Sequence, residues 1–123
     1  MSHFSEIAAK YKALMEKGAF LQVIDRYYHE NIKQKENNET SIKGRAALRE
    51  MEEKNLEGVH AVELEIPAMI IDEVQGMVMG EMLIRFHSKK HGWKKLEEAF
   101  IQKWEDGKII YQRFYYHAIE DLL

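Results

Sequence analysis

Hydrophobic residues in the first half of the chain recur at intervals of three and four, the spacing that predicts amphipathic helices. One set spans positions 4–15, a second set follows at 20–27, and a third helix is expected from 44 to about 57. Each set would place its apolar side chains on one face. We therefore expect helices that each bury a single stripe of residues.

The period changes to two after Gly58, which predicts strands. Four long strands are expected at 59–71, 77–88, 93–104 and 108–117, and a short strand at 31–37. Pro67 predicts a bend or bulge in the first long strand, because proline cannot donate to a ladder. Asp106-Gly107 is a hairpin signal. Helices followed by an antiparallel meander predict an α+β fold with the helices on one sheet face.

Length and composition narrow the class of protein. The chain has 123 residues, which fits one domain spanning 1–123. It has no cysteine, which excludes disulfides and thiolate chemistry, and its net charge of −3 offers no basic field for nucleic acid. We see no secretory signal and no apolar run of membrane-spanning length. These features predict a cytoplasmic protein that binds neither nucleic acid nor membrane.

Two stretches carry a family resemblance. They are "KENNETSIKGRAAL", a strand, loop, glycine and helix, and the final "WEDGKIIYQRFYYH". Their order and spacing, over nearly the whole chain, resemble the SnoaL-like branch of the NTF2-like superfamily. That resemblance implies a cystatin-like cone, in which a curved antiparallel sheet wraps around N-terminal helices and encloses an apolar pocket. Ketosteroid isomerases, polyketide cyclases, epoxide hydrolases, dehydratases and non-enzymatic binding proteins share this fold, so the fold alone does not fix the function.

Two residues are candidates for catalysis. In the family, an acid often stands at the end of the last strand, and this chain has His117 there. A histidine titrates near neutral pH and suits proton transfer. Glu36 shares a strand face with Ile32, and a carboxylate among apolar walls has a raised pKa. The alternatives are an exposed histidine at a strand end and a solvated glutamate beside a polar loop.

Further residues are candidates for ligand binding. Glu81 and Arg85 share one face of their strand, whereas the opposite face is apolar, and we expect Glu81 to face inward because related chains carry polar residues there. Tyrosine and tryptophan side chains could line a pocket and offer hydroxyl and N–H groups for hydrogen bonds to a ligand. The alternative is that they pack in the core or at an interface. The ligand-binding candidates are Gln34, Tyr28, Glu81, Arg85, Trp104, Tyr115 and Tyr116.

No cofactor or metal is expected. The chain lacks the glycine-rich motifs of nucleotide-binding proteins. His87 and His91 have a spacing suited to metal ligands on a helix, but here they straddle a strand end and a turn, without a third ligand.

The resemblance implies two functional alternatives. One is a cofactor-independent acid–base enzyme, an isomerase, cyclase or dehydratase, acting on a small apolar compound with a carbonyl group. His117 or Glu36 would remove a proton, and a tyrosine or protonated acid would stabilise the enolate. The other is a binding or scaffold domain without turnover. The resemblance also implies a homodimer formed through the outer sheet face, which a meander with apolar residues on both faces favours.

Overall fold

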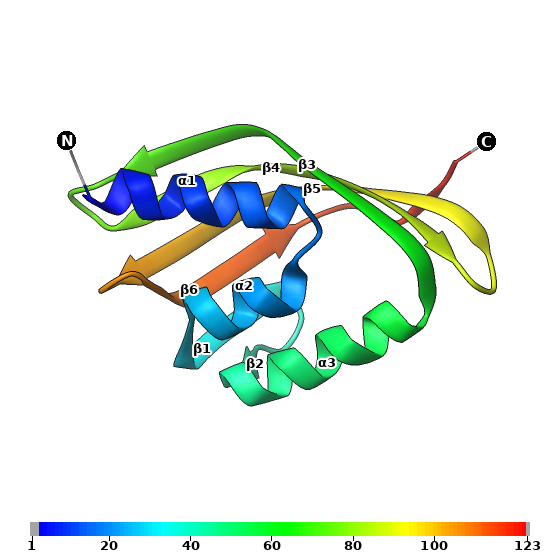
Figure 1. Ribbon diagram of the computed structural model, residues 1–123, viewed down its shortest axis with the longest axis horizontal. Helices are drawn as coiled ribbons and strands as arrows, with labels where there is room; N and C mark the ends of the chain where they lie inside the picture. Colours follow the sequence, from blue (N-terminus) through cyan, green and yellow to red (C-terminus); the bar gives the residue numbers. More distant parts are fainter. Residues whose placement is uncertain (1–2, 123) are drawn as a thin grey trace.

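The computed structural model describes residues 3–122, which form three helices and a curved seven-stranded sheet (Figure 1). The helices are α1 (His3–Glu16), α2 (Phe20–Tyr27) and α3 (Arg45–Glu57). The strands are β1 (Tyr28–Glu36), β2 (Ile42–Lys43), β3 (Val59–Asp72), β4 (Met77–Ser88), β5 (Gly92–Glu105), β6 (Lys108–Tyr115) and β7 (Glu120–Asp121). The α+β class is confirmed.

The sheet has the order β2-β1-β6-β5-β4-β3, and β7 adds to β5. The meander from β3 to β6 is antiparallel throughout, as the alternation predicts. The pairing of β1 with β6 is parallel, which corrects the expectation of a wholly antiparallel sheet. These two strands lie far apart in the sequence, so a hairpin does not dictate their direction. The periodicity gives no signal for β2 and β7, which have two residues each.

One hairpin turn and one strand irregularity follow directly from the sequence. Asp106 and Gly107 have φ of 49° and 76°, the paired positive values that an Asp-Gly hairpin adopts. The register between β3 and β4 shifts between Glu65 and Ala68, which confirms the irregularity predicted at Pro67. Such a bulge bends the strand and helps the sheet to curve.

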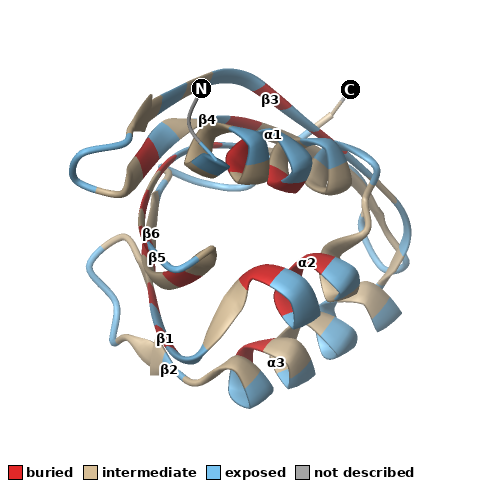
Figure 2. Ribbon diagram, turned by 60° about the vertical axis from the view of Figure 1, so that its left-hand side comes forward, coloured by how far each residue is buried: buried red, intermediate tan, exposed pale blue. Residues whose placement is uncertain are grey.

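The concave face of the sheet wraps around the helices, and buried residues occur both on the helices and on the strands around them (Figure 2). Helix α1 packs against β3, whereas α2 and α3 pack against each other. The inner positions of β4 are apolar, and Val78 and Met82 are buried. The largest fully buried side chains include Tyr11, Ile32, Leu48, Phe100 and Ile109. Part of this core, including Leu48, also lines a cavity.

Candidate functional site

A cavity of about 450 Å³ lies between α2, α3 and the inner face of the sheet. Its volume falls in the range of small-molecule sites, about 300–1,000 Å³. Most of its wall is apolar, with Val23 and Leu48 from the helices and residues of four strands opposite them. The strand residues of this wall include Leu64, Met82, Ile84, Phe86, Leu96 and Phe114. The cavity suits a mainly apolar ligand.

Three carboxyl groups enter this apolar wall: Glu36 from β1, Glu52 from α3 and Glu98 from β5. Side chains alternate along a strand, so Glu98 shares the inward face of β5 with the buried Phe100. The same rule puts Glu36 on the inward face of β1 with Ile32, which is where the sequence predicts it. The cavity is therefore apolar in surface but acidic in its titratable groups.

Glu98 is the most strongly perturbed of these acids. Its side chain is buried, with a residue exposure of 9 %. Burial, and secondarily the negative charge of Glu36, raise the pKa of Glu98 to about 7. No hydrogen bond or ion pair of its carboxyl group is found within residues 3–122. A carboxylic acid with this pKa holds its proton close to neutral pH, which is the condition for general acid–base work.

The pKa values of three other groups in the cavity wall, Glu36, Glu52 and Tyr116, are also raised. Burial raises the pKa of Glu36, with a smaller contribution from the charge of Glu39, and burial also raises the pKa of Glu52. Tyr116 also lines the cavity. Its pKa is raised by desolvation and then by the charges of Glu36, Glu39 and Glu98. The cavity thus holds a pair of acids, Glu36 and Glu98, that influence each other.

Gln34 and Tyr28 add neutral polar groups to the wall. The Gln112 side chain on β6 donates one hydrogen bond to the Tyr28 hydroxyl (2.8 Å) and another to Gln34 Oε1. Burial raises the pKa of Tyr28 to about 12, although the hydrogen bond from Gln112 acts in the opposite direction. Tyr28 is therefore a neutral hydroxyl at physiological pH, and it can donate a hydrogen bond to a ligand.

His117 and Tyr115 do not reach the cavity. Strand β6 ends at Tyr115, whose side chain is exposed on the outer face, and His117 is an exposed residue beyond that end. Tyr116 alone of the three terminal ring side chains lines the cavity. The alternation of β6 explains this, because Gln112 and Phe114 occupy its inward positions and Tyr116 continues the same alternation one residue beyond the strand. The placement leaves His117 without access to a ligand in this cavity.

Glu81, Arg85 and Trp104 also lie elsewhere than expected. Glu81 is exposed on the outer face of β4, which corrects the expectation that it faces inward, and Arg85 forms an ion pair with Glu65 (3.1 Å) on that same face. The physical reason is that the apolar face of β4 is the one that covers the core. Trp104 is buried against Phe4 and Tyr11 in the core and does not line the cavity.

Sequence reasoning missed Glu98, Glu52 and Gln112. A signal for Glu98 does exist, since "EAFIQKW" places Glu98, Phe100, Gln102 and Trp104 on one strand face. The two large aromatic residues mark that face as the buried one, and the polar residues between them follow. Glu52 lies four residues after Leu48 and four before Leu56, within the stripe of α3 that lines the cavity, but a single acid in the stripe of a largely exposed helix gives no signal for a site.

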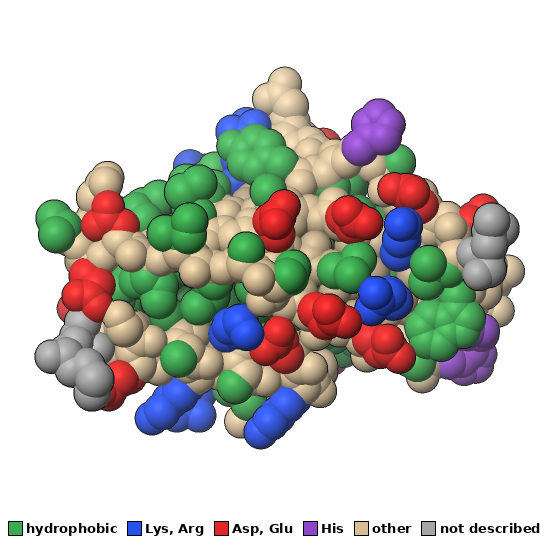
Figure 3. All heavy atoms as spheres, turned by 90° about the horizontal axis from the view of Figure 1, so that it is seen from above, with side chains coloured by type: hydrophobic (Ala, Val, Ile, Leu, Met, Phe, Trp, Pro, Cys, Tyr) green, Lys and Arg blue, Asp and Glu red, His purple; other side chains and the backbone are tan. Residues whose placement is uncertain are grey.

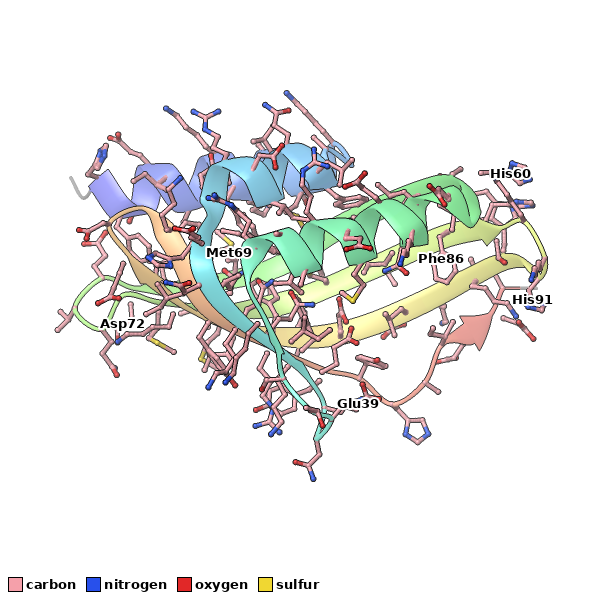
Figure 4. All side chains as sticks on the ribbon, turned by 90° about the horizontal axis from the view of Figure 1, so that it is seen from below. Glu39, His60, Met69, Asp72, Phe86 and His91 are labelled. Atoms are coloured by element: carbon pink, nitrogen blue, oxygen red, sulfur yellow. The ribbon has the colours of Figure 1, made fainter. Side chains whose placement is uncertain are left out.

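The two ends of the long strands differ in character (Figure 4). His60 and His91 lie at one end and Asp72 at the other, while Glu39 lies at the tip of the loop that follows β1. The His60 and His87 rings have centroids 5.2 Å apart. No group of three or more potential His, Asp or Glu metal ligands occurs in the described part of the chain.

Within residues 3–122, no helix is long and apolar enough to cross a membrane.

This arrangement can carry out proton transfer in a cavity whose wall is mostly apolar. Glu36 and Glu98 both have raised pKa values, and the pKa of Glu98 is raised to about 7. Tyr28 supplies a hydroxyl and Gln34 a carboxamide on the same wall. A base, an acid and hydrogen-bond donors are the groups that enolisation of a carbonyl compound requires.

Comparisons with known proteins agree with this fold. The structure is similar to that of a Mesorhizobium loti protein assigned to the SnoaL-like polyketide cyclases (TM-score 0.77, 24 % identity, 94 % of this chain and 100 % of that one). It is also similar to SalBIII, an epoxide hydrolase/cyclase-like enzyme in pyran ring formation in the polyether salinomycin (0.79, 18 %, 97 % and 95 %). A third similar structure is that of a Bacillus subtilis protein assigned as an isomerase (TM-score 0.76, 18 % identity, 95 % of this chain and 90 % of that one).

Sequence comparison is consistent with these structural matches. No curated protein matches the chain in sequence. The family model for the SnoaL-like domain matches residues 2–116, which is nearly the whole chain. The chain therefore belongs to the SnoaL-like domain family.

Proposed function

We propose that this protein is a cofactor-independent acid–base enzyme of the isomerase, cyclase or dehydratase type, acting on a small, mostly apolar carbonyl compound. The observation that carries the proposal is the pair of carboxyl groups, Glu36 and Glu98, in one apolar cavity. Their environments separate their pKa values, which is how one site provides both a base and an acid near neutral pH.

In the proposed reaction, the Glu36 carboxylate removes a proton from the carbon next to the carbonyl group. The C–H electron pair becomes the carbon–carbon double bond of an enolate, and negative charge moves to the carbonyl oxygen. Tyr28 and Gln34 donate hydrogen bonds to that oxygen. Protonated Glu98 then supplies a proton to a second carbon, or to a departing hydroxyl group. The first outcome is an isomerisation and the second a dehydration, and each conserves protons.

The assignment of base and acid follows from electrostatics. Glu98 is the more deeply buried of the two acids, so desolvation disfavours its charged form more strongly, and Glu36 is the group that we expect to ionise first. Glu98 keeps its proton until about pH 7. The rate would therefore rise with pH as Glu36 ionises and fall again as Glu98 loses its proton. His117 has no part in this reaction, because it is exposed and outside the cavity wall.

The experiment is hydrogen–deuterium exchange at the α-carbon of a ketone panel, from 2-tetralone to a 3-ketosteroid, followed by NMR in D₂O. This assay detects enolisation without knowledge of the natural product. We expect the wild type to catalyse exchange and Glu36→Gln to lose about 100-fold or more, because Glu36 is the base that removes the α-hydrogen. Glu98→Gln should keep α-exchange and lose the later protonation of the second carbon, which the same NMR experiment follows with a β,γ-unsaturated 3-ketosteroid. His117→Gln is the control and keeps the wild-type rate. Equal rates for all four proteins would contradict the assignment.

The second candidate is a ligand-binding protein without turnover. The observation that favours it is the apolar character of most of the cavity wall, which would hold a ligand without any chemistry. The deuterium-exchange assay distinguishes the two functions when it is combined with a measurement of ligand binding. Ketones that raise the melting temperature of the protein, but exchange no α-hydrogen above the uncatalysed rate, would support binding alone.

We also infer a homodimer formed through the outer sheet face. Hydrophobic side chains gather on the face seen in Figure 3, among acidic and basic ones. Ile70 on β3 and Met79 on β4 are neighbours in the ladder and are 73 % and 51 % exposed. Tyr115 and Trp93 add exposed aromatic area. A second copy would cover these groups.

A further inference from the structure

Three glutamines lie side by side across the inner face of the sheet. Gln34 on β1 is the ladder partner of Gln112 on β6, and Gln112 is the partner of Gln102 on β5. Gln34 is 7 % exposed, and the other two are fully buried. A buried carboxamide needs partners for its oxygen and for its two N–H groups. A row of three such groups in an otherwise apolar core calls for a reason beyond packing.

Hydrogen bonds join this row into one chain of donors and acceptors. The Trp104 indole Nε1 donates to Gln102 Oε1 (3.0 Å). Gln102 Nε2 donates to Gln112 Oε1 (3.1 Å) and to the Tyr11 hydroxyl (2.9 Å). Gln112 Nε2 donates in turn to Gln34 Oε1 and to the Tyr28 hydroxyl. Every polar atom of Gln102 and Gln112 therefore has a partner.

One residue sets the direction of the whole chain. A carboxamide can be turned over, and a tyrosine hydroxyl can either donate or accept, so Gln102, Gln112 and Tyr11 would fit either direction. An indole N–H can only donate. Trp104 therefore forces Gln102 to present its oxygen to the indole and its N–H groups to Gln112. Each later link follows, since an oxygen that accepts leaves the nitrogen of the same amide to donate.

The chain ends at the cavity with two donors. Gln34 uses its oxygen to accept from Gln112, which leaves its Nε2 hydrogens for the cavity that it lines. No protein acceptor for this nitrogen is found within residues 3–122, and the atom is not shut off from the cavity space. The Tyr28 hydroxyl accepts from Gln112, so its own hydrogen is available to a ligand.

We propose that Trp104 acts through Gln102 and Gln112 as a positioning residue that fixes two hydrogen-bond donors, Gln34 Nε2 and Tyr28 O–H, on the cavity wall, and that the ligand places an acceptor oxygen between them. This inference deepens the proposed function and rests on it for the identity of that oxygen as the carbonyl of the substrate. It adds that the site discriminates against ligands with a donor, or with no polar atom, at this position.

The first experiment measures the direction of the chain in the free protein, by NMR exchange of the side-chain amide hydrogens with solvent. In the wild type, both Nε2 hydrogens of Gln102 and of Gln112 are expected to exchange slowly, and those of Gln34 faster. Among the described residues of this network, Trp104 is the group that forbids the reverse direction, and Trp104→Phe removes it. In that variant, one Gln34 hydrogen would bind Gln112 Oε1, and its exchange would slow.

Tyr11→Phe is the matched control. Tyr11 accepts a hydrogen bond from Gln102 but lies off the route from Trp104 to the cavity. Its loss disturbs the same buried network and keeps the wild-type pattern of Gln34 exchange. If Trp104→Phe does not fold, Gln102→Met takes its place, because it interrupts the chain and leaves the indole in the core. Slow exchange of a Gln34 hydrogen already in the wild type would overturn the proposed direction.

The second experiment uses two fluorescent probes of equal shape, 6-propionyl-2-dimethylaminonaphthalene and the 6-propyl analogue that lacks the carbonyl oxygen. Emission of the ketone moves to longer wavelength when its oxygen accepts hydrogen bonds. We expect the wild type and Tyr11→Phe to bind the ketone about tenfold more tightly than the hydrocarbon, with red-shifted emission. Trp104→Phe loses that preference and the shift. Equal binding of the two probes to the wild type, or no binding of the ketone, would overturn the ligand assignment.

These outcomes are separable from those of the enolisation assay. If the donor direction and the ketone preference hold but no α-hydrogen exchanges, the cavity binds carbonyl compounds and the catalytic roles of Glu36 and Glu98 fail. Exchange at the α-carbon could be catalysed while Trp104→Phe leaves the Gln34 hydrogen-exchange rates and the probe preference unchanged. That result would support the proposed enzymatic function and contradict the positioning role of Trp104.

Discussion

Glu36 and Glu98 face the same cavity from β1 and β5, strands separated only by β6, and the charge of Glu36 raises the pKa of Glu98. Two acids held in this way cannot ionise independently, because the second proton leaves against the charge of the first. The pair is the feature of this chain that links its fold most directly to a chemical capability.

Replacement of Glu36 should lower the pKa of Glu98. Glu36→Gln removes the negative charge and keeps the shape, so the pKa of Glu98 is expected to fall below about 7. It should stay above its ordinary value, since burial is the larger cause of the shift. The measurement is a ¹³C NMR titration of the Glu98 carboxyl carbon. Glu39→Gln is the control, because the charge of Glu39 acts on Glu36 and Tyr116 but not on Glu98. A pKa that does not move in Glu36→Gln would show that the two groups are uncoupled.

The contribution of Glu98 to stability should decrease as the pH rises from about 4.5 to about 7. The pKa of Glu98 is raised from 4.5 to about 7 on folding, so between these values the folded state holds more protons than the unfolded state. This contribution to the free energy of unfolding therefore falls as pH rises from about 4.5, and the loss is complete above about 7. The shift corresponds to at most about 3 kcal/mol.

Glu98→Gln tests that dependence. The variant lacks the titrating group, so its free energy of unfolding should fall less steeply than that of the wild type between pH 5 and pH 8. Urea unfolding at several pH values measures the difference. Glu97→Gln removes the adjacent, exposed carboxyl group and should keep the wild-type slope. Parallel pH profiles for the wild type and Glu98→Gln would mean that Glu98 ionises as it does in the unfolded chain.

Gly80 is required by the close approach of β3 to β4. A Cβ atom at this position would lie 2.3 Å from the Ala68 carbonyl oxygen and 2.9 Å from the Phe100 ring. Neither the strand backbone nor the buried ring can move away freely, so Gly80→Ala is expected to destabilise the fold by at least about 2 kcal/mol. Gly58→Ala is the control. Its Cβ would meet the Asn55 oxygen at 3.5 Å, an ordinary contact, and its stability should change by less than about 1 kcal/mol. Equal melting temperatures for the two variants would exclude the clash.

The architecture could be predicted from the sequence because it rests on periodicity, which is local. The switch after Gly58 predicts the meander, and β4 has the bounds Met77–Ser88 that the pattern predicts. The site could be predicted only in part. Alternation placed Glu36 and Gln34 correctly, since Ile32 marks the inward face of β1.

The remaining site residues depend on which strands become neighbours. Nothing local says that β1 pairs in parallel with β6, yet this pairing brings Gln34 to Gln112 and Glu36 near Tyr116. The expectation for His117 relied on the family pattern at a strand end, where β6 has already finished and the chain is exposed. For Glu81, the purely apolar opposite face of β4 was the better guide.

Met79→Glu should prevent the proposed dimer. Met79 lies on the outer face of β4 opposite Ile70, and a charge buried at an apolar interface has no partner there. We expect the wild type to sediment as a dimer at micromolar concentration and the variant as a monomer with an unchanged circular dichroism spectrum. Lys54→Glu, an exposed change on α3 away from the sheet, is the control and should remain dimeric. A monomeric wild type would leave the outer face without this role, and a dimeric Met79→Glu would place the contact on another surface.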